Sequence, residues 1–373
     1  MTGASEKPEG CDADRRFMRA ALSLAARGLG RVAPNPAVGC VLVRAGRVVG
    51  RGWTQPGGRP HAETEALSRA GEAARGATAY VTLEPCSHHG KTRPCADALI
   101  EAGVARVVAA MADPDDRVSG RGIERLRAAG IATDVGLLEA EAQALNLGFV
   151  LNRMAGRPMV TLKLATTLDG RIATAAGESQ WITGAEARAE AHLLRARHDA
   201  VAVGIGTALA DDPSLTVRLP GLSGLPQPLR VIFDSRARLP ADARLCDGAA
   251  ETLVLAGESP PVRIGAAEVL ACPTDPSGRL DAAEALRRLG ARGITRLLVE
   301  GGGELAASLL RAGCVDRVVW FRAGAVIGGD GRAGVGPLAL RALADAPRFR
   351  LTAQRAVGPD VLEEWARGPA PPL

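Results

Sequence analysis

The chain has 373 residues, enough for two domains of ordinary size, and 47% of them are apolar, which excludes wholesale disorder. Its formal net charge of +5 is compatible with nucleic acid or with a small anionic substrate. The basic residues never form a run, and five Phe, four Trp and one Tyr are few for stacking on bases, so no nucleic-acid partner is expected.

Targeting signals are not predicted. The acidic N-terminal segment has no apolar stretch typical of a signal peptide, and no run of 18 apolar residues predicts a membrane span. Seven cysteines are an odd number, spread through an enzyme-sized chain. This pattern favours reduced thiols over a disulfide framework, and so a cytoplasmic protein.

The first half of the chain alternates between helical and strand patterns. Asp12 begins a predicted helix that runs to about Gly28, and strands 38–44 and 47–54 form a hairpin around Ala45 and Gly46. Further helices are predicted at 61–74, 96–101, 123–129 and 139–151, and further strands at 78–84, 106–111 and 131–135. The alternation predicts an α/β domain with a parallel or mixed sheet.

The alternation begins again after the segment 152–158, which we interpret as a linker. Strands are predicted at 159–165, 200–205, 229–234, 252–256, 296–300 and 315–321, and helices at 185–197 and from Gly303. We therefore expect two α/β domains in series, residues 1–152 and 153–373.

Histidine, glutamate and cysteine gather in the first half, in 61-HAE-63 and 84-EPCSHHGKTRPC-95. A catalytic zinc needs three protein ligands and an open position, and His61, Cys86 and Cys95 are a usual set. Zinc lowers the pKa of a bound water to about 7, and Glu63 would then carry its proton to a leaving amine. The alternative is a structural zinc site or a group of buried thiols, in which Glu63 would have no role.

The pattern is typical of zinc nucleobase deaminases, which pair H-x-E with P-C-x-x-C. Here eight residues separate the two cysteines, which argues against a plain cytidine or adenosine deaminase. His88 and Lys91 lie between the cysteines, so we expect them to face the substrate. Asn35, held between prolines in 34-PNPAVG-39, can hydrogen-bond a pyrimidine edge, although a turn-forming asparagine is the alternative.

The three motifs PNPAVG, HAE and EPCSHHGKTRPC, in this order, resemble the deaminase domain of the bifunctional riboflavin biosynthesis deaminase–reductase family. Arg93 departs from the family pattern, which usually has a second proline there. The resemblance implies a cytidine-deaminase-like three-layer domain. It also implies deamination of the phosphoribosylated diaminopyrimidinone that is derived from GTP.

The second half carries the glycines Gly301–Gly303 between a predicted strand and helix, a suitable site for a pyrophosphate although such turns are common. The glycines Gly204 and Gly206 after a predicted strand lack the third glycine of a G-x-G-x-x-G motif, which disfavours a Rossmann domain. Residues 163–184, 204–218 and 300–310 are similar to the reductase domain of the same family, whose fold resembles dihydrofolate reductase.

The resemblance also implies two sets of binding residues in the second half. The NADPH site would be lined by Ala165, Trp181, Thr207, Asp211, Ser235, Gly302, Gly303, Glu304, Leu305, Ala306, Ala307 and Ser308. The substrate would be held by Ser179, Arg195, Leu215, Arg218 and Glu300. Arginine pairs can fork onto a phosphate, and Glu300 can accept from sugar hydroxyls or an amine. Lys163 and Asp169 also match, without an assigned role.

The sequence thus predicts a bifunctional enzyme of riboflavin biosynthesis that uses Zn²⁺ and NADPH on a small phosphorylated pyrimidine. Its second step would reduce the ribosyl side chain to ribityl. Three alternatives are a deaminase of bases in nucleic acid, a zinc-stabilised regulator, and a deaminase with a degenerate second domain. A homo-oligomer is possible.

Overall fold

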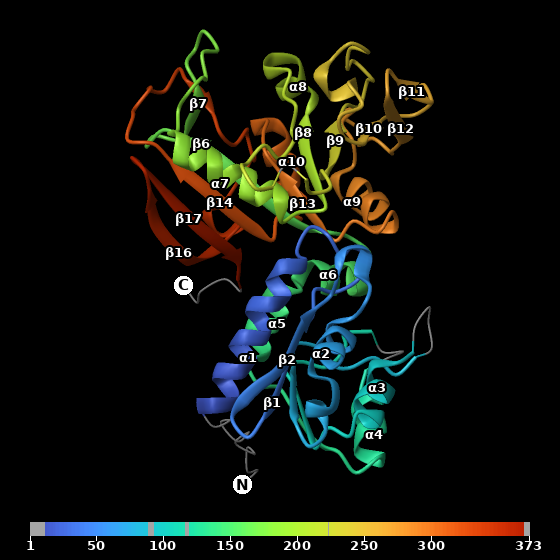
Figure 1. Cartoon of the computed structure of the whole chain (residues 1–373). Helices are drawn as coiled ribbons and strands as arrows, with labels where there is room; N and C mark the ends of the chain where they lie inside the picture. Colours follow the sequence, from blue (N-terminus) through green and yellow to red (C-terminus); the bar gives the residue numbers. More distant parts are fainter. Residues whose placement is uncertain (1–11, 89–92, 116–118, 223, 369–373) are drawn as a thin grey trace. The chain divides into compact units, whose positions relative to one another are not determined.

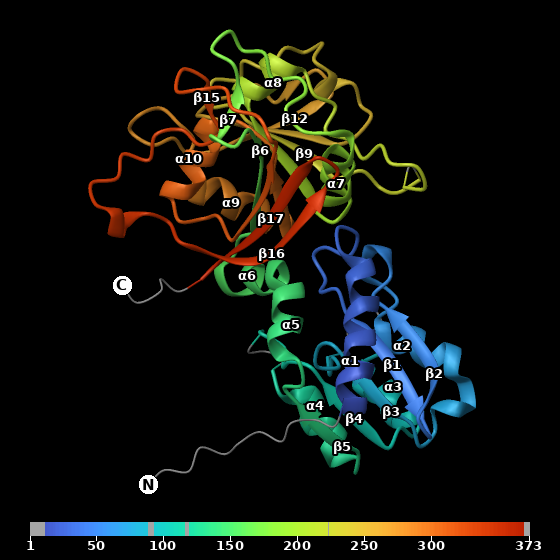
Figure 2. The same ribbon diagram turned by 90° about the vertical axis from the view of Figure 1, so that its left-hand side faces the viewer.

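The computed structural model describes residues 12–88, 93–115, 119–222 and 224–368. The chain divides into two compact units, Met1–Ala155 and Gly156–Leu373, called the first and second unit below. Figures 1 and 2 show an α/β arrangement in each of them. Among the described residues, no helix combines the length and the apolar character needed to cross a membrane.

The first unit is built on one five-stranded sheet in the order β2-β1-β3-β4-β5. Its strands are β1 (Gly39–Arg44), β2 (Arg47–Trp53), β3 (Thr78–Val81), β4 (Arg106–Ala109) and β5 (Ala132–Val135). β1 pairs antiparallel with β2 and β3, whereas β3, β4 and β5 run parallel. The predicted hairpin is confirmed, because Ala45 (φ 49°) and Gly46 (φ 74°) form its two-residue turn.

Helices cover both faces of this sheet, which gives three layers (Figure 1). The helices are α1 (Asp12–Ala25), α2 (Ala62–Ala70), α3 (Cys95–Glu101), α4 (Arg121–Ala128), α5 (Glu139–Leu145) and α6 (Leu147–Ala155). Two glycines let helices approach the sheet closely on its opposite faces. A Cβ on Gly39 would lie 1.9 Å from the Ala21 oxygen of α1. A Cβ on Gly52 would lie 2.3 Å from the Ala62 oxygen of α2. Because residues alternate across a strand, α1 and α2 lie on opposite sides.

Two details of the first unit differ from the prediction. The single helix expected at 139–151 is broken into α5 and α6 at Asn146, whose side chain accepts from the Ala37 amide (2.9 Å) and donates to its carbonyl (3.0 Å). These contacts hold the loop before β1 against the residue at which the helix is interrupted. The expected linker at 152–158 is also partly wrong, since α6 continues to Ala155.

The second unit contains a ten-stranded sheet in the order β11-β12-β10-β9-β8-β13-β6-β14-β17-β16. Its strands are β6 (Met159–Thr166), β8 (Ala200–Gly204), β9 (Leu229–Phe233), β10 (Thr252–Ala256), β11 (Arg263–Ile264), β12 (Ala267–Ala271), β13 (Arg296–Val299), β14 (Arg317–Arg322), β16 (Phe349–Val357) and β17 (Asp360–Arg367). The strands from β12 to β14 run parallel, and the outer pairs at both ends are antiparallel. A separate small sheet joins β7 (Arg171–Ala173) to β15 (Arg332–Ala333).

The central strands bury side chains on both faces of the large sheet. Leu297 and Val299 of β13 belong to the core beneath α9 (Ala282–Ala291) and α10 (Gly303–Arg311). Leu298, between them, belongs to a second core with residues of α8 (Ile205–Asp211). This explains why the predicted strands are unbroken apolar runs, as expected for parallel strands covered on both faces. On the second face α7 (Ala185–Ala196) contributes Ala187 to a further cluster.

The hairpin of β16 and β17 was not predicted. Nearly every side chain of β16 is exposed, so the strand shows no apolar alternation. It forms because β17 offers a backbone edge to pair with, and β17 in turn pairs with β14. Backbone pairing at an edge leaves little trace in the hydrophobic pattern.

Candidate active sites

Three predicted metal ligands meet at the ends of elements of the first unit. His61 precedes α2 as its N-cap residue, Cys86 follows β3, and Cys95 is the first residue of α3. The His61 Nδ1 atom lies 3.2 Å from Cys95 Sγ and 3.7 Å from Cys86 Sγ, and the possible ligand atoms of all three lie within 4.8 Å of one another. These separations suit a tetrahedral zinc with two thiolates and one imidazole.

The pKa values of the two cysteines show that their surroundings favour the binding of a cation. A hydrogen bond from the Cys95 side chain lowers the pKa of Cys86 to about 4, and the Cys95 amide, 3.3 Å from Cys86 Sγ, adds to this shift. The same hydrogen bond raises the pKa of Cys95, as do burial and the repulsion from the Cys86 thiolate. A divalent cation would remove that repulsion and favour both thiolates.

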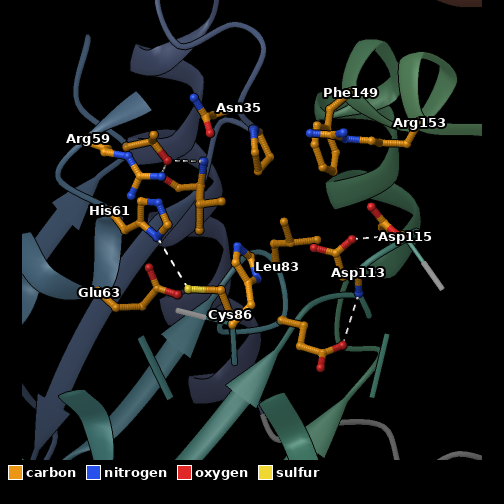
Figure 3. Close-up of a pocket in the computed structure, with 15 residues that line it drawn as sticks. Asn35, Arg59, His61, Glu63, Leu83, Cys86, Asp113, Asp115, Phe149 and Arg153 are labelled. Atoms are coloured by element: carbon orange, nitrogen blue, oxygen red, sulfur yellow. Dashed lines mark hydrogen bonds between the residues drawn. The ribbon is translucent and has the colours of Figure 1, made fainter. Parts of the chain in front are cut away.

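Glu63 lies on α2, one residue into the helix from Ala62, and its carboxylate is directed toward the space beside Cys86 and His61 (Figure 3). The residue is only 3% exposed, and burial raises the pKa of its carboxyl group to about 7 in the absence of a metal. A carboxyl group with such a pKa can both accept and donate a proton near neutral pH. Glu63 lies beside the cluster, where it can exchange a proton while a metal takes its three protein ligands from His61, Cys86 and Cys95.

The cluster opens into a cavity of about 430 Å³. The predicted residues Asn35, His61, Glu63 and Cys86 contribute to its wall (Figure 3). His88 lines it as well. The cavity is also lined by Pro36, Val38, Thr54, Arg59, Leu83, Glu84, Asp113, Asp115, Phe149 and Arg153. Lys91 lies outside the described residues.

Two residues that were not predicted, Asp113 and Asp115, face the same cavity from the segment after β4 (Figure 3). Burial raises the pKa of Asp113, and nearby Glu84 adds to the effect. A signal was present: β3 and β4 are neighbouring parallel strands, so the segments after both meet at one edge of the sheet. The motif 113-DPDD-116 stands at that edge, as 84-EPC-86 does.

The polar centre of the second unit is the pair Arg195–Glu300, both predicted to bind substrate. Arg195, on α7, and Glu300, directly after β13, form a two-pronged ion pair whose Arg195 Nη2–Glu300 Oε2 distance is 2.9 Å. Burial opposes ionisation of Glu300, yet the Arg195 charge and hydrogen bond keep its pKa lowered. The pair is therefore charged in the folded protein.

Arg218 joins this centre through Thr216. Arg195 Nη1 donates to the Thr216 carbonyl (2.9 Å), and Arg218 Nη1 donates to the Thr216 hydroxyl (3.0 Å). The Arg218 amide donates to His192 Nδ1 (3.2 Å). His192 was missed, although it lies three residues before Arg195 on one helix and so shares its face.

Lys163 and Asp169, which had no predicted role, occupy different surroundings. Burial lowers the pKa of Lys163, while the Glu300 carboxylate opposes this shift. Asp169 accepts from the amides of Ile327 (3.3 Å) and Gly328 (2.7 Å), so it fastens the segment after β6 to the segment after β14. Hydrogen bonds, first from the Thr167 hydroxyl, lower the pKa of Asp169 to about 2.

The residues expected at the NADPH site are brought together only in part. Thr207 on α8 contacts the glycine turn, since a Cβ on Gly301 would lie 3.2 Å from its side chain. Gly302 is the N-cap of α10, where free amides favour an anion. Leu305 and Ala306 are in the apolar core, and Glu304 pairs with Arg279 at 3.0 Å.

Among the described interactions, no contact joins the remaining predicted residues of the second unit into one site. Ala165 is on β6, and Ser179 lies in the segment before α7. Asp211 ends α8, Ser235 follows β9, and Ala307 and Ser308 lie in α10. Leu215 is buried in the core and has a φ of 51°. Trp181 is 69% exposed, with the Arg188 guanidinium carbon 4.6 Å from its ring centre. An exposed ring of this kind is available to a flat ligand.

Comparison with known families assigns each unit. Residues 11–111 match the cytidine and deoxycytidylate deaminase zinc-binding region, and residues 158–362 match the RibD C-terminal domain. The predicted fold class, a cytidine-deaminase-like domain followed by a reductase-type α/β domain, is confirmed. The match also identifies the first unit as one with a zinc-binding region.

Similar proteins cover nearly the whole chain. The riboflavin biosynthesis protein RibD of Escherichia coli is 46% identical, over 93% of this chain and 98% of its own length. The Aquifex aeolicus RibD protein is 41% identical, over 94% and 97%. Among solved structures, Acinetobacter baumannii RibD has a TM-score of 0.85 at 38% identity, covering 96% of this chain and 99% of its own.

A Thermotoga maritima structure has a TM-score of 0.86 at 36% identity and covers 95% of this chain and 99% of its own. It is described as a diaminohydroxyphosphoribosylaminopyrimidine deaminase/5-amino-6-(5-phosphoribosylamino)uracil reductase.

Proposed function

The chain belongs to the RibD family of riboflavin biosynthesis, and we propose that its first unit carries the deaminase site and its second unit the reductase site. It is a bifunctional enzyme with both activities. The first reaction would replace the ring amine of the phosphoribosylated diaminopyrimidinone by a carbonyl oxygen from water, releasing ammonia. The second would reduce the ribosyl chain to ribityl with NADPH.

Deamination would use the residues around the metal cluster. His61, Cys86 and Cys95 would hold zinc, whose Lewis acidity makes water nucleophilic near neutral pH. Glu63, buried beside the cluster, would accept the proton of the attacking water and pass it on, so that the amine leaves as ammonia. A buried carboxylate performs this transfer without competition from bulk water.

The cavity wall would orient the pyrimidine and its sugar. The Asn35 amide can pair with the polar edge of the ring, because an amide offers both a donor and an acceptor. Asp113 and Asp115 can accept hydrogen bonds from ribose hydroxyls. The cationic side chains Arg59 and Arg153 also line the cavity and suit the phosphate.

Reduction would use the centre of the second unit, with hydride passing from NADPH to the anomeric carbon of the ring-opened sugar. The Arg195 guanidinium is committed to Glu300, so it would orient this carboxylate toward sugar hydroxyls or the amine. Arg218 is more exposed and would contact the phosphate. The free amides at the start of α10 would receive the pyrophosphate of NADPH.

The observation that carries the deaminase proposal is the buried Glu63 beside three converging zinc ligands. The test supplies purified enzyme with the diaminopyrimidinone phosphate, with and without NADPH, and follows product masses. Glu63→Gln should retain about one zinc per chain and lose deamination, because an amide cannot carry the proton.

Glu65→Gln is the matched control: Glu65 is on the same helix but pairs with Arg69 at 2.8 Å on the surface. This variant should keep both activities. Substantial deamination by Glu63→Gln, or protein prepared without chelator that contains no zinc, would refute the assignment. Reduction of supplied deaminated intermediate should persist in both variants, since the reductase site has its own residues.

A further inference from the structure

A second buried glutamate, Glu84, lies in the first unit and has no part in the chemistry described above. It follows β3, two residues before Cys86, and is only 4% exposed. Its carboxylate accepts four backbone amides: those of Asp113 (3.2 Å) and Gly120 (2.9 Å) on Oε2, and those of Gly122 (2.8 Å) and Ile123 (3.4 Å) on Oε1. Two carboxylate oxygens offer about four acceptor sites, so this set uses their full capacity.

These amides belong to the segment between β4 and the first turn of α4. The N-cap of α4, Gly120, has no side chain to accept the free amides of the helix, and Glu84 accepts two of them from outside. The negative charge at a helix start is also favoured by the helix dipole. Glu84 thus fixes both ends of the segment that carries the aspartates of the cavity.

The hydrogen bonds continue from Glu84 into the cavity. The amide of Asp113 donates to Glu84, and the carboxylate of Asp113 in turn accepts the amide of Asp115 (2.9 Å), as Figure 3 shows for the two aspartates. The Glu84 amide itself donates to the Met111 carbonyl (3.0 Å). A short chain of hydrogen bonds therefore connects the backbone beside a zinc ligand to both aspartates.

The start of α4 packs closely against the segment that leads to Cys86. A Cβ on Gly122 would lie 1.9 Å from the Pro85 oxygen and 3.1 Å from Glu84 Oε1. The first turn of α4 rests directly on the peptide that joins Glu84 to Cys86. Direct contacts therefore set the distance between Cys86 and the two aspartates. Glu84 binds the amide of Asp113, and Pro85, next to Glu84, contacts Gly122 of α4.

We propose that Glu84 is a positioning residue of the deaminase, which sets Asp113 and Asp115 at a fixed place relative to the zinc ligand Cys86. This inference rests on the proposed function of the cavity. Glu84 acts through the aspartates, because its own oxygens are occupied by amides. A glutamine cannot replace it, since its NH₂ group would face two of the amide donors.

The experiment compares Glu84→Gln with the wild-type full-length protein, both loaded with zinc. The kcat/KM for deamination should fall by at least tenfold, through KM as well as kcat, while zinc stays at about one per chain. Reduction of the deaminated intermediate by the same molecule should be unchanged. An unaltered kcat/KM for deamination, or loss of zinc from the variant, would overturn the proposal.

A double-mutant cycle with Asp113→Ala tests whether Glu84 acts through that aspartate. If it does, Glu84→Gln should add little to the defect of Asp113→Ala; fully additive effects would contradict the proposal. Asp14→Asn is the control for general destabilisation, because Asp14 is another buried carboxylate of the first unit, bonded to Tyr80 and Arg106 outside the cavity. It should lower stability and leave kcat/KM for deamination unchanged.

Hydrogen exchange of the wild-type protein gives an answer even if Glu84→Gln does not fold. The amides of Asp113, Gly120, Gly122 and Ile123 should exchange slowly, and exchange at the rate of free loop amides would refute the role of Glu84. The Glu63→Gln variant separates the two proposals. Deamination that survives Glu63→Gln would refute the proposed chemistry, while the exchange rates and the kcat/KM of Glu84→Gln would still decide the positioning role.

Discussion

Burial of His198 predicts a specific loss of stability of the second unit in mild acid. The residue is 3% exposed, and its ring bonds the Leu194 carbonyl through Nδ1 (2.7 Å) and the Thr161 hydroxyl through Nε2 (2.9 Å). A neutral ring satisfies both contacts, with Nδ1 as donor and Nε2 as acceptor. Burial, reinforced by the charge of Arg296, lowers its pKa to about 3.

The magnitude follows from linkage between protonation and folding. The folded pKa of about 3 lies below the unfolded value of about 6.5, so the unfolded chain binds the proton more readily between these pH values. The contribution of neutral His198 to the free energy of unfolding is therefore fully present above a pH of about 6.5, and it is lost as the pH falls toward about 3. Between pH 7 and pH 5 the loss from this residue amounts to about 2 kcal/mol.

The assay measures urea unfolding of wild-type protein and His198→Gln at several pH values between 7 and 5. A Trp53→Phe background confines tryptophan fluorescence to the second unit, which holds Trp181, Trp320 and Trp365. The variant should be less stable at pH 7, yet its free energy of unfolding should fall by about 2 kcal/mol less on acidification. Equal pH dependence in the two proteins would refute the neutral, buried state of His198.

Two further predictions concern the two sites. Arg218→Ala should lower the reductase kcat/KM by about ten- to a hundredfold through loss of a charge-assisted phosphate contact, with deamination intact; a loss of both activities in folded protein would contradict separate sites. Asn146→Ala leaves the buried amide and carbonyl of Ala37 without their partner, which should cost roughly 2–4 kcal/mol of stability. Unfolding followed through Trp53 in a background with Trp181, Trp320 and Trp365 replaced by Phe measures this cost. A rise in the KM for deamination should accompany it, because the same loop carries Asn35.

The convergence of His61, Cys86 and Cys95 could be predicted from the sequence because each of them is identified by residue type. Imidazole and thiolate are the usual zinc ligands, and His61, Cys86 and Cys95 stand at ends of elements that short-range patterns predict. The buried strands were predicted for a related reason. Parallel strands covered on both faces must be apolar runs, as β8, β10 and β13 are.

Other features depended on the tertiary structure, because they join residues far apart in sequence whose meeting is set by strand order. Arg195 and Glu300 are 105 residues apart and pair only because α7 covers the sheet near the end of β13. Glu84 and Ile123, 39 residues apart, meet because β3 and β4 are neighbours. The hydrophobic pattern of a strand shows that it is buried and leaves its neighbours in the sheet undetermined, so polar contacts between strand ends are decided only when the sheet is assembled.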